Sequence, residues 1–193
     1  MFKPVFIKSA ARPADFPDDE GIELAVVGRS NSGKSSAINC IVGMRKLARV
    51  SKTPGRTQLI NFFELAPERR VVDLPGYGFA RVPDAMRLRW RGLIEAYFGS
   101  RQSLRGLMIT VDIRRGLVEL DLTMIDWVSK LGIPMLLLLT KTDKLSRGVS
   151  LAQLRQVEQQ APAGAASILF SAIDKTGVNE ARTQLRDWLD LDS

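Results

Sequence analysis

The chain has 193 residues, of which 45% are hydrophobic and 25% charged, as is ordinary for one soluble globular domain. The single cysteine, Cys40, excludes an internal disulfide framework, and the lack of histidine excludes a cysteine–histidine zinc site. Lys and Arg number 28 against 21 Asp and Glu, a formal net charge of +7 that favours a polyanionic partner such as RNA.

The predicted elements begin after an irregular N-terminal arm, residues 1–20, which is rich in proline. Six strands are predicted, at 22–27, 59–65, 70–74, 107–113, 134–139 and 168–170. Five stretches with helical spacing lie between these strands or after the last one, at 35–42, 86–97, 120–131, 151–160 and 179–189. This alternation predicts a three-layer α/β fold with a six-stranded, mostly parallel sheet and one antiparallel edge strand.

Residues 28–35 join the first predicted strand to the first predicted helix and read Gly-Arg-Ser-Asn-Ser-Gly-Lys-Ser. The spacing is that of a P-loop, whose glycines let backbone amides wrap around phosphate at a helix N-terminus. Lys34 can bridge the β- and γ-phosphates, and the Ser35 hydroxyl can ligate Mg²⁺. The sequence therefore predicts nucleotide binding.

A second motif, Asp73-Leu74-Pro75-Gly76, ends the third predicted strand. An aspartate at this place can hold Mg²⁺ through the water shell of the ion, and the Gly76 amide can reach the γ-phosphate. The distance from the P-loop favours this function over a plain turn.

The base is predicted to be guanine because of the run Thr140-Lys141-Thr142-Asp143. The Asp143 carboxylate can accept hydrogen bonds from N1–H and the 2-amino group of guanine, which adenine cannot provide. The Lys141 stem can pack against the base plane, and the Thr140 hydroxyl can replace the asparagine that is commoner at this position. This motif argues against the alternative, an ATP-dependent P-loop kinase or ATPase. After the last strand, Ser171-Ala172 offers a backbone amide to guanine O6.

A polar segment with proline and glycine, residues 51–58, lies between the P-loop and Asp73 and is predicted to be a mobile loop. A threonine in such a loop can add its hydroxyl to Mg²⁺ and its amide to the γ-phosphate, so that the loop orders with triphosphate. Thr57 is the first choice for this residue and Thr53 the second.

The chain resembles the EngB (YihA/YsxC) family of bacterial GTP-binding proteins, within the Era/TrmE-like translation-factor GTPases. The runs that carry the resemblance are Lys52-Thr53-Pro54-Gly55-Arg56-Thr57-Gln58, Asp73-Leu74-Pro75-Gly76-Tyr77-Gly78-Phe79-Ala80 and Asp112-Ile113-Arg114-Arg115-Gly116. The resemblance implies a Ras-like G domain over residues 21–193 that hydrolyses GTP to GDP. It also implies a role in assembly of the large (50S) ribosomal subunit and a need for the protein in normal cell division and septation. A basic C-terminal tail is absent, so RNA contacts of such a tail do not transfer.

The resemblance also implies the site residues. Mg²⁺ is expected at Ser35 and Thr57. Contacts with GTP or GDP are expected at Gly28, Arg29, Ser30, Asn31, Ser32, Gly33, Lys34, Ser35, Gly55, Arg56, Thr57, Gln58, Leu59, Asp73, Leu74, Pro75, Gly76, Thr140, Lys141, Thr142, Asp143, Phe170, Ser171 and Ala172.

Hydrolysis is expected to be slow, because Tyr77 stands where Ras-like enzymes place the glutamine that orients water. Two sources for the missing element stay open. Asn31 resembles the asparagine that binds K⁺ in related GTPases, which would make it catalytic beside Lys34 and Thr57; alternatively, the ribosome completes the site. A nucleotide-gated module that acts directly on division proteins is the alternative function.

A cytoplasmic location without a membrane partner is expected, because the longest apolar run, 133–139, is too short to span a bilayer. The first residues also lack the apolar block of a signal peptide. We further expect a monomer.

Overall fold

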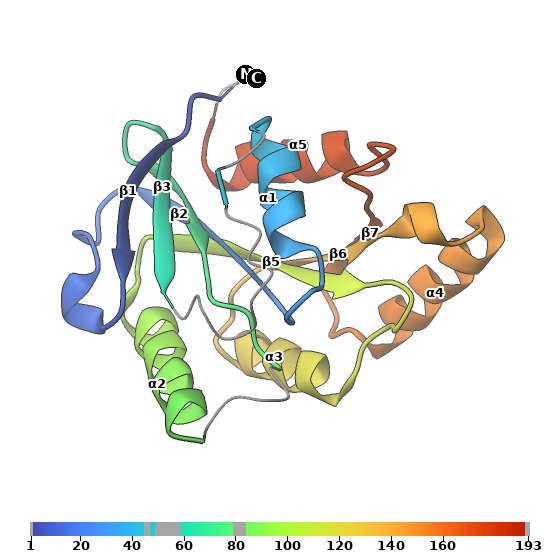
Figure 1. Cartoon of the computed structure of the whole chain (residues 1–193), viewed down its shortest axis with the longest axis horizontal. Coiled ribbons are helices and arrows are strands. Elements are labelled where there is room, and N and C mark those ends of the chain that lie inside the picture. Colours follow the sequence, from blue (N-terminus) through green and yellow to red (C-terminus); the bar gives the residue numbers. More distant parts are fainter. Residues whose placement is uncertain (1, 45–46, 49–58, 79–83, 192–193) are drawn as a thin grey trace.

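A computed structural model describes residues 2–44, 47–48, 59–78 and 84–191. Its strands are β1 (Val5–Ala10), β2 (Ile22–Gly28), β3 (Ile60–Ala66), β4 (Arg69–Asp73), β5 (Leu104–Asp112), β6 (Met135–Thr140) and β7 (Ala166–Leu169). Its helices are α1 (Lys34–Val42), α2 (Asp84–Ser100), α3 (Glu119–Lys130), α4 (Arg147–Gln160) and α5 (Val178–Trp188), with short 3-10 turns η1 (Pro13–Asp15) and η2 (Thr142–Lys144). The predicted three-layer α/β arrangement is confirmed (Figure 1).

The sheet has seven strands in the order β1-β3-β4-β2-β5-β6-β7. β3 runs antiparallel to both of its neighbours, and the remaining pairs are parallel. The predicted count of six is one strand short, because β1 forms within the segment that was expected to be irregular. β1 pairs with β3 from Val5 opposite Glu64 to Ala10 opposite Ile60. Its strand structure therefore depends on a partner about fifty residues away, which a local pattern does not reveal.

The central strands are buried on both faces, as their apolar sequences predict. Every residue of β2 is buried, and so are all residues of β6 and the last seven of β5. Because β4, β2, β5, β6 and β7 run parallel, their carboxyl ends meet at one edge of the sheet. Ligands of open α/β sheets bind beyond this edge.

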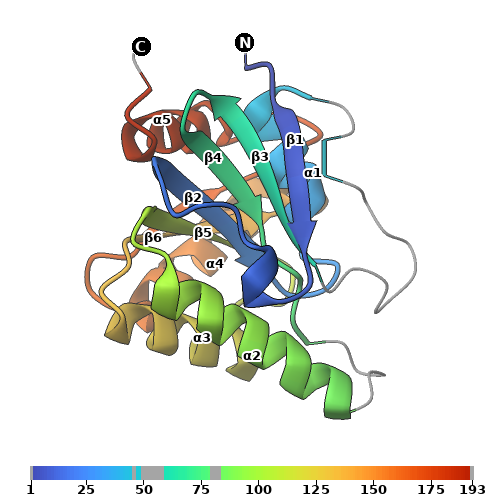
Figure 2. The same ribbon diagram turned by 90° about the vertical axis from the view of Figure 1, so that its left-hand side faces the viewer.

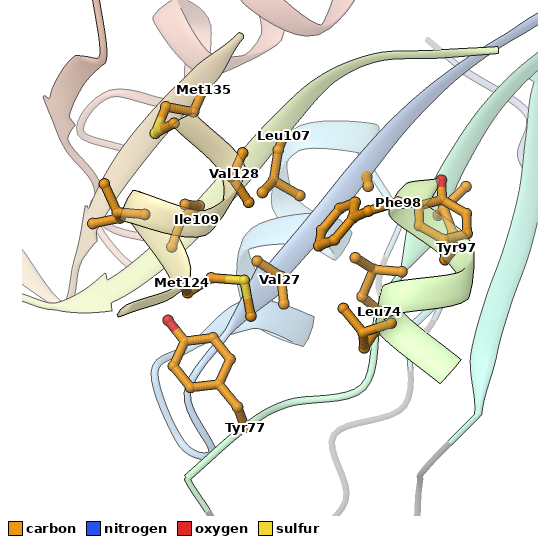
Figure 3. Packing of buried hydrophobic residues seen from close by; sticks show 14 of the residues in the cluster. Val27, Leu74, Tyr77, Tyr97, Phe98, Leu107, Ile109, Met124, Val128 and Met135 are labelled. Carbon is orange, nitrogen blue, oxygen red and sulfur yellow. The ribbon is translucent and has the colours of Figure 1, made fainter. Parts of the chain in front are cut away.

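Two apolar cores fix the sheet between its helical layers. One contains residues of α2, α3 and α4, among them Phe98, Met124 and Val157. Figure 3 shows Phe98 and Met124 in this core. The other contains residues of α1 and α5, such as Ile38 and Leu185. Figure 2 shows α2 and α3 together on one side of the sheet, with α1 and α5 on the other. No helix in the described parts of the chain combines the length and the apolarity that crossing a membrane requires.

A buried ionic cluster lies at the amino end of β2, opposite the edge that carries the motifs. Glu23 is fully buried and pairs with Arg101 at the end of α2, while the Tyr97 hydroxyl donates to Glu23 Oε2 over 2.9 Å. Burial, reinforced by the Glu23 carboxylate, raises the pKa of Tyr97 well above its ordinary value, so the phenol stays a donor. Arg101 Nη1 also donates to the Pro17 carbonyl over 2.7 Å, which ties the segment before β2 to the sheet.

Candidate nucleotide-binding site

The strand register brings the four described motifs side by side at the carboxyl edge of the sheet. Val26 near the end of β2 pairs with Asp73 at the end of β4, and Gly28 pairs with Thr110 of β5. One strand further along, Asp112 of β5 pairs with Thr140 of β6. Residues distant in the sequence therefore form one surface.

The P-loop needs its glycines for steric reasons. A Cβ at Gly28 would lie 2.0 Å from Thr110 Oγ1, which excludes any side chain there. Gly33 has φ +93° and caps α1 in the left-handed conformation, and Asn31 has φ +64°. Ser32 is buried, with its Oγ 2.6 Å from Thr110 Oγ1, so the loop is anchored on β5. Sequence reasoning missed Thr110, whose only signal is a hydroxyl within an apolar strand.

The phosphate lysine of the P-loop and the aspartate of the second motif form an ion pair in this structure. Lys34 Nζ donates to Asp73 Oδ1, and the two side chains are 13% and 8% exposed. The Leu74 amide donates to the Val26 carbonyl over 3.0 Å, which fixes the Asp73 segment beside β2. The structure thus brings together the two groups that were predicted to act on phosphate and Mg²⁺.

Gly76 and Tyr77 cross the start of the P-loop. The Tyr77 amide donates to the Gly28 carbonyl over 3.3 Å, and the Ser30 amide donates to the Tyr77 carbonyl over 2.8 Å. A Cβ on Gly76 would lie 3.2 Å from the Gly28 carbonyl oxygen, so the close crossing favours glycine.

The side chain of Tyr77 lies in the core (Figure 3). It is 5% exposed, its hydroxyl donates to Asp121 Oδ1 over 2.8 Å, and its ring centroid lies 6.2 Å from that of Trp90. Burial, followed by the neighbouring Asp121 charge, raises the pKa of Tyr77 far above its ordinary value. Its hydroxyl therefore stays protonated and is held by α3.

The first two residues of the predicted guanine motif are bound to the P-loop. Thr140 is buried and its hydroxyl donates to the Ser32 carbonyl, a bonding role expected for the hydroxyl at this position. Lys141 has φ +65°, and its Nζ donates to the Asn31 carbonyl over 2.6 Å and to Asp112 Oδ2 over 2.8 Å.

The carboxylate of Asp143 is held by a hydroxyl from the last motif. Ser171 Oγ donates to Asp143 Oδ1 over 2.8 Å, while Lys144 Nζ lies 3.1 Å from Oδ2 at ion-pair distance but without hydrogen-bond geometry. The Ser171 bond, which outweighs burial, lowers the pKa of Asp143 from its ordinary value. Asp143 therefore stays an ionised acceptor at neutral pH.

These contacts join the four motifs into one site at the carboxyl edge of the sheet. A family of proteins described as 50S ribosome-binding GTPases matches residues 23–141. A relative, the probable GTP-binding protein EngB of Enterobacter sp. (strain 638), is 48% identical over 186 residues, which cover 95% of this chain and 89% of that protein. The chain belongs to the EngB family. It is therefore a GTPase.

Solved structures share this fold both within the EngB family and outside it. The crystal structure of a probable GTP-binding protein EngB superposes with a TM-score of 0.72 at 21% identity, covering 88% of this chain and all of that one. Era, solved in complex with MgGDPNP and nucleotides 1506–1542 of 16S ribosomal RNA, gives a TM-score of 0.67 at 19% identity, covering 88% of this chain and 57% of Era. The predicted P-loop GTPase fold is thus confirmed.

Some residues implied by the resemblance to the EngB family lie outside the described parts of the chain. These are Thr57, its alternative Thr53, and Gly55, Arg56 and Gln58. Their roles stay predictions.

The structure places two further predicted contact residues, Leu59 and Phe170. Leu59 is half-buried just before β3. Phe170 is 1% exposed in the core, and its amide donates to the Leu139 carbonyl, so its backbone links the loops after β6 and β7.

Proposed function

We propose that this GTPase is a slow, nucleotide-driven switch in assembly of the large ribosomal subunit, needed for normal cell division and septation. The observation that carries the proposal is the match of residues 23–141 to a family described as 50S ribosome-binding GTPases. The formal net charge of +7 also suits a partner made largely of RNA. We propose a cytoplasmic monomer that meets its partner in the GTP state.

The nucleotide is proposed to lie along the P-loop, with its base between Lys141 and the loop after β7. Asp143 would accept from the N1–H and 2-amino groups of guanine, and the Ala172 region would offer a backbone amide to O6. Because Ser171 already fixes Asp143, the acceptor is oriented before the base arrives. We propose that GTP contacts all of the residues that the resemblance to the EngB family implies.

Mg²⁺ fits the donors at the phosphate end of the site. Ser35 supplies a hydroxyl in the first turn of α1, and Asp73, which is bonded to the adjacent Lys34, supplies a carboxylate. Oxygen ligands are those that Mg²⁺ prefers. Within the described residues no group of three or more acidic or cysteine side chains could hold a metal alone, so the ion would bind together with the nucleotide phosphates. Ser35 and Thr57 would hold Mg²⁺, which when bound neutralises charge that develops on the phosphates.

Catalysis would depend on positioning and electrostatics without a covalent intermediate. Lys34 would leave Asp73 for the β- and γ-phosphates, and P-loop amides would donate to the same oxygens. Tyr77, buried against Asp121, offers nothing to the attacking water. We therefore propose slow intrinsic hydrolysis that a further group accelerates.

Potassium held with the help of Asn31 is our proposal for that group. Asn31 is exposed at the mouth of the P-loop, and its side-chain amide has no hydrogen-bond partner within the described ranges, whereas its carbonyl accepts from Lys141. GTP turnover should be about tenfold faster in potassium than in sodium buffer, because the cation offsets charge in the transition state. Asn31→Ala should remove the difference, and Asn179→Ala, at an exposed asparagine of α5, should keep it. Equal turnover in both salts, unchanged by Asn31→Ala, would contradict the proposal.

Gradient sedimentation tests the ribosomal role. Mixed with large subunits and a nonhydrolysable GTP analogue, the protein should sediment with them; with GDP it should stay near the top, because only the triphosphate orders the loops that present the binding surface. Small subunits serve as the control. A protein that stays at the top with both nucleotides would remove the main support for the proposal and favour direct action on division proteins.

A further inference from the structure

Asp112 lies outside every nucleotide motif, yet it is bonded to one of them. We propose that Asp112 is a positioning residue that holds Lys141 against the P-loop and so sets the affinity for guanine nucleotides. This inference rests on the proposed role of Lys141 and Asp143 in guanine binding, and it adds a residue and a physical cause to that role.

The position of Lys141 is fixed from two sides. Its Nζ donates to the Asn31 carbonyl of the P-loop over 2.6 Å and to Asp112 Oδ2 at the end of β5 over 2.8 Å. Its backbone is in the left-handed region, φ +65°, which a lysine rarely adopts. With both ends constrained, the aliphatic stem keeps one path across the site.

Asp112 is itself held rigidly. It is 5% exposed and pairs with Thr140 in the sheet, one residue before Lys141. Arg114 donates to both of its oxygens, from Nε to Oδ1 over 2.9 Å and from Nη2 to Oδ2 over 2.7 Å. Burial opposes ionisation, but the bonds from Arg114 and Lys141 outweigh it and hold the pKa of Asp112 well below its ordinary value. The carboxylate is therefore charged throughout the physiological range.

A merely structural ion pair would not need Lys141. Arg114 already satisfies Asp112 with a two-pronged bond, the strongest arrangement for a carboxylate. The second cation comes from the guanine motif and reaches on to the P-loop, so Asp112 joins the base end of the site to its phosphate end. Fixing a flexible lysine before the ligand binds reduces the side-chain entropy lost on binding.

Asp112→Asn tests the proposal, because it keeps the shape of the side chain and removes the charge that orders Lys141. We expect the Kd values for GDP and GTP to rise about 10- to 100-fold, as when one partner of a buried charged pair is lost, and kcat at saturating GTP to change less than about threefold. Lys141→Met should weaken binding by a similar factor. Asp126→Asn is the matched control and should leave the Kd values unchanged, because Asp126 is an exposed aspartate of α3 that pairs with Lys130.

A double-mutant cycle decides whether Asp112 acts through Lys141. Added to Lys141→Met, Asp112→Asn should weaken GDP binding by less than about twofold further. If the increases in Kd caused by the two substitutions multiply in the double variant, or if Asp112→Asn binds GDP like wild type, the proposal is overturned. If Lys141→Met itself binds like wild type, the guanine role of Lys141 has failed instead. If Asp112→Asn does not fold by circular dichroism, Asp112→Glu enters the same cycle, because its longer stem displaces Lys141 while keeping the charge for Arg114; additive effects would again overturn the proposal.

Discussion

Asp143→Asn should lower the affinity for GDP and GTP by about 10³- to 10⁴-fold, because the site would lose the acceptor that guanine requires. The carboxylate is proposed to accept from two donors of the base, and Ser171 Oγ already donates to one of its oxygens over 2.8 Å. The NH₂ group of an asparagine is a hydrogen-bond donor, and it would face the 2-amino group of guanine, which is a donor as well. Xanthine carries a carbonyl oxygen at that place, so the variant should gain affinity for xanthosine nucleotides.

Competition with a fluorescent GDP analogue measures this change in specificity. Asp126→Asn is the matched control, because Asp126 is an exposed aspartate of α3 that pairs with Lys130 and lies outside the site. It should leave both affinities unchanged. An Asp143→Asn protein that keeps GDP affinity within tenfold of wild type and gains nothing for xanthosine nucleotides would show that another residue recognises the base.

The core strands and the motifs could be predicted from the sequence because their causes are local. An apolar run such as 107–113 is typical of a strand covered on both faces, and β5 occupies Leu104–Asp112. Gly28 and Gly33 have steric roles that hold wherever a backbone wraps around phosphate. The hydroxyl of Thr140 was expected to form a hydrogen bond, and the Ser32 carbonyl accepts it.

The features that sequence reasoning missed all depend on partners far along the chain. β1 becomes a strand because β3 pairs with it, and its exposed Phe6 gives no periodic signal. Thr110 and Asp112 become parts of the site because the register of β5 places them against the P-loop and the guanine motif. Their chemistry is visible in the sequence, whereas their neighbours are defined only by the fold.

Replacement of the phosphate lysine should have the largest effect on turnover. In Lys34→Met, GTP hydrolysis should fall about 10³-fold or more and the Kd for GTP should rise about 10²- to 10³-fold, because the charge that offsets the γ-phosphate in the transition state is lost. Phosphate release assays and calorimetry measure the two quantities. Lys130→Met, at an exposed lysine of α3, is the control and should match wild type. Hydrolysis within tenfold of wild type in Lys34→Met would contradict the proposed role.

The ion pair with Asp73 adds a second consequence to the same substitution. Lys34→Met leaves a carboxylate that is 8% exposed without its cation, which should cost about 3–5 kcal/mol of folding stability in the nucleotide-free protein and should repel the incoming phosphates. Adding Asp73→Asn should therefore restore part of the thermal stability and part of the affinity for GDP, although not hydrolysis. If the double variant is no more stable and binds GDP no better than Lys34→Met, the unpaired Asp73 carboxylate is not the cause of the lost stability and affinity. If GDP binding recovers while GTP turnover does not, Lys34 has two distinct roles. It neutralises Asp73 in the nucleotide-free protein, and it stabilises the transition state of hydrolysis.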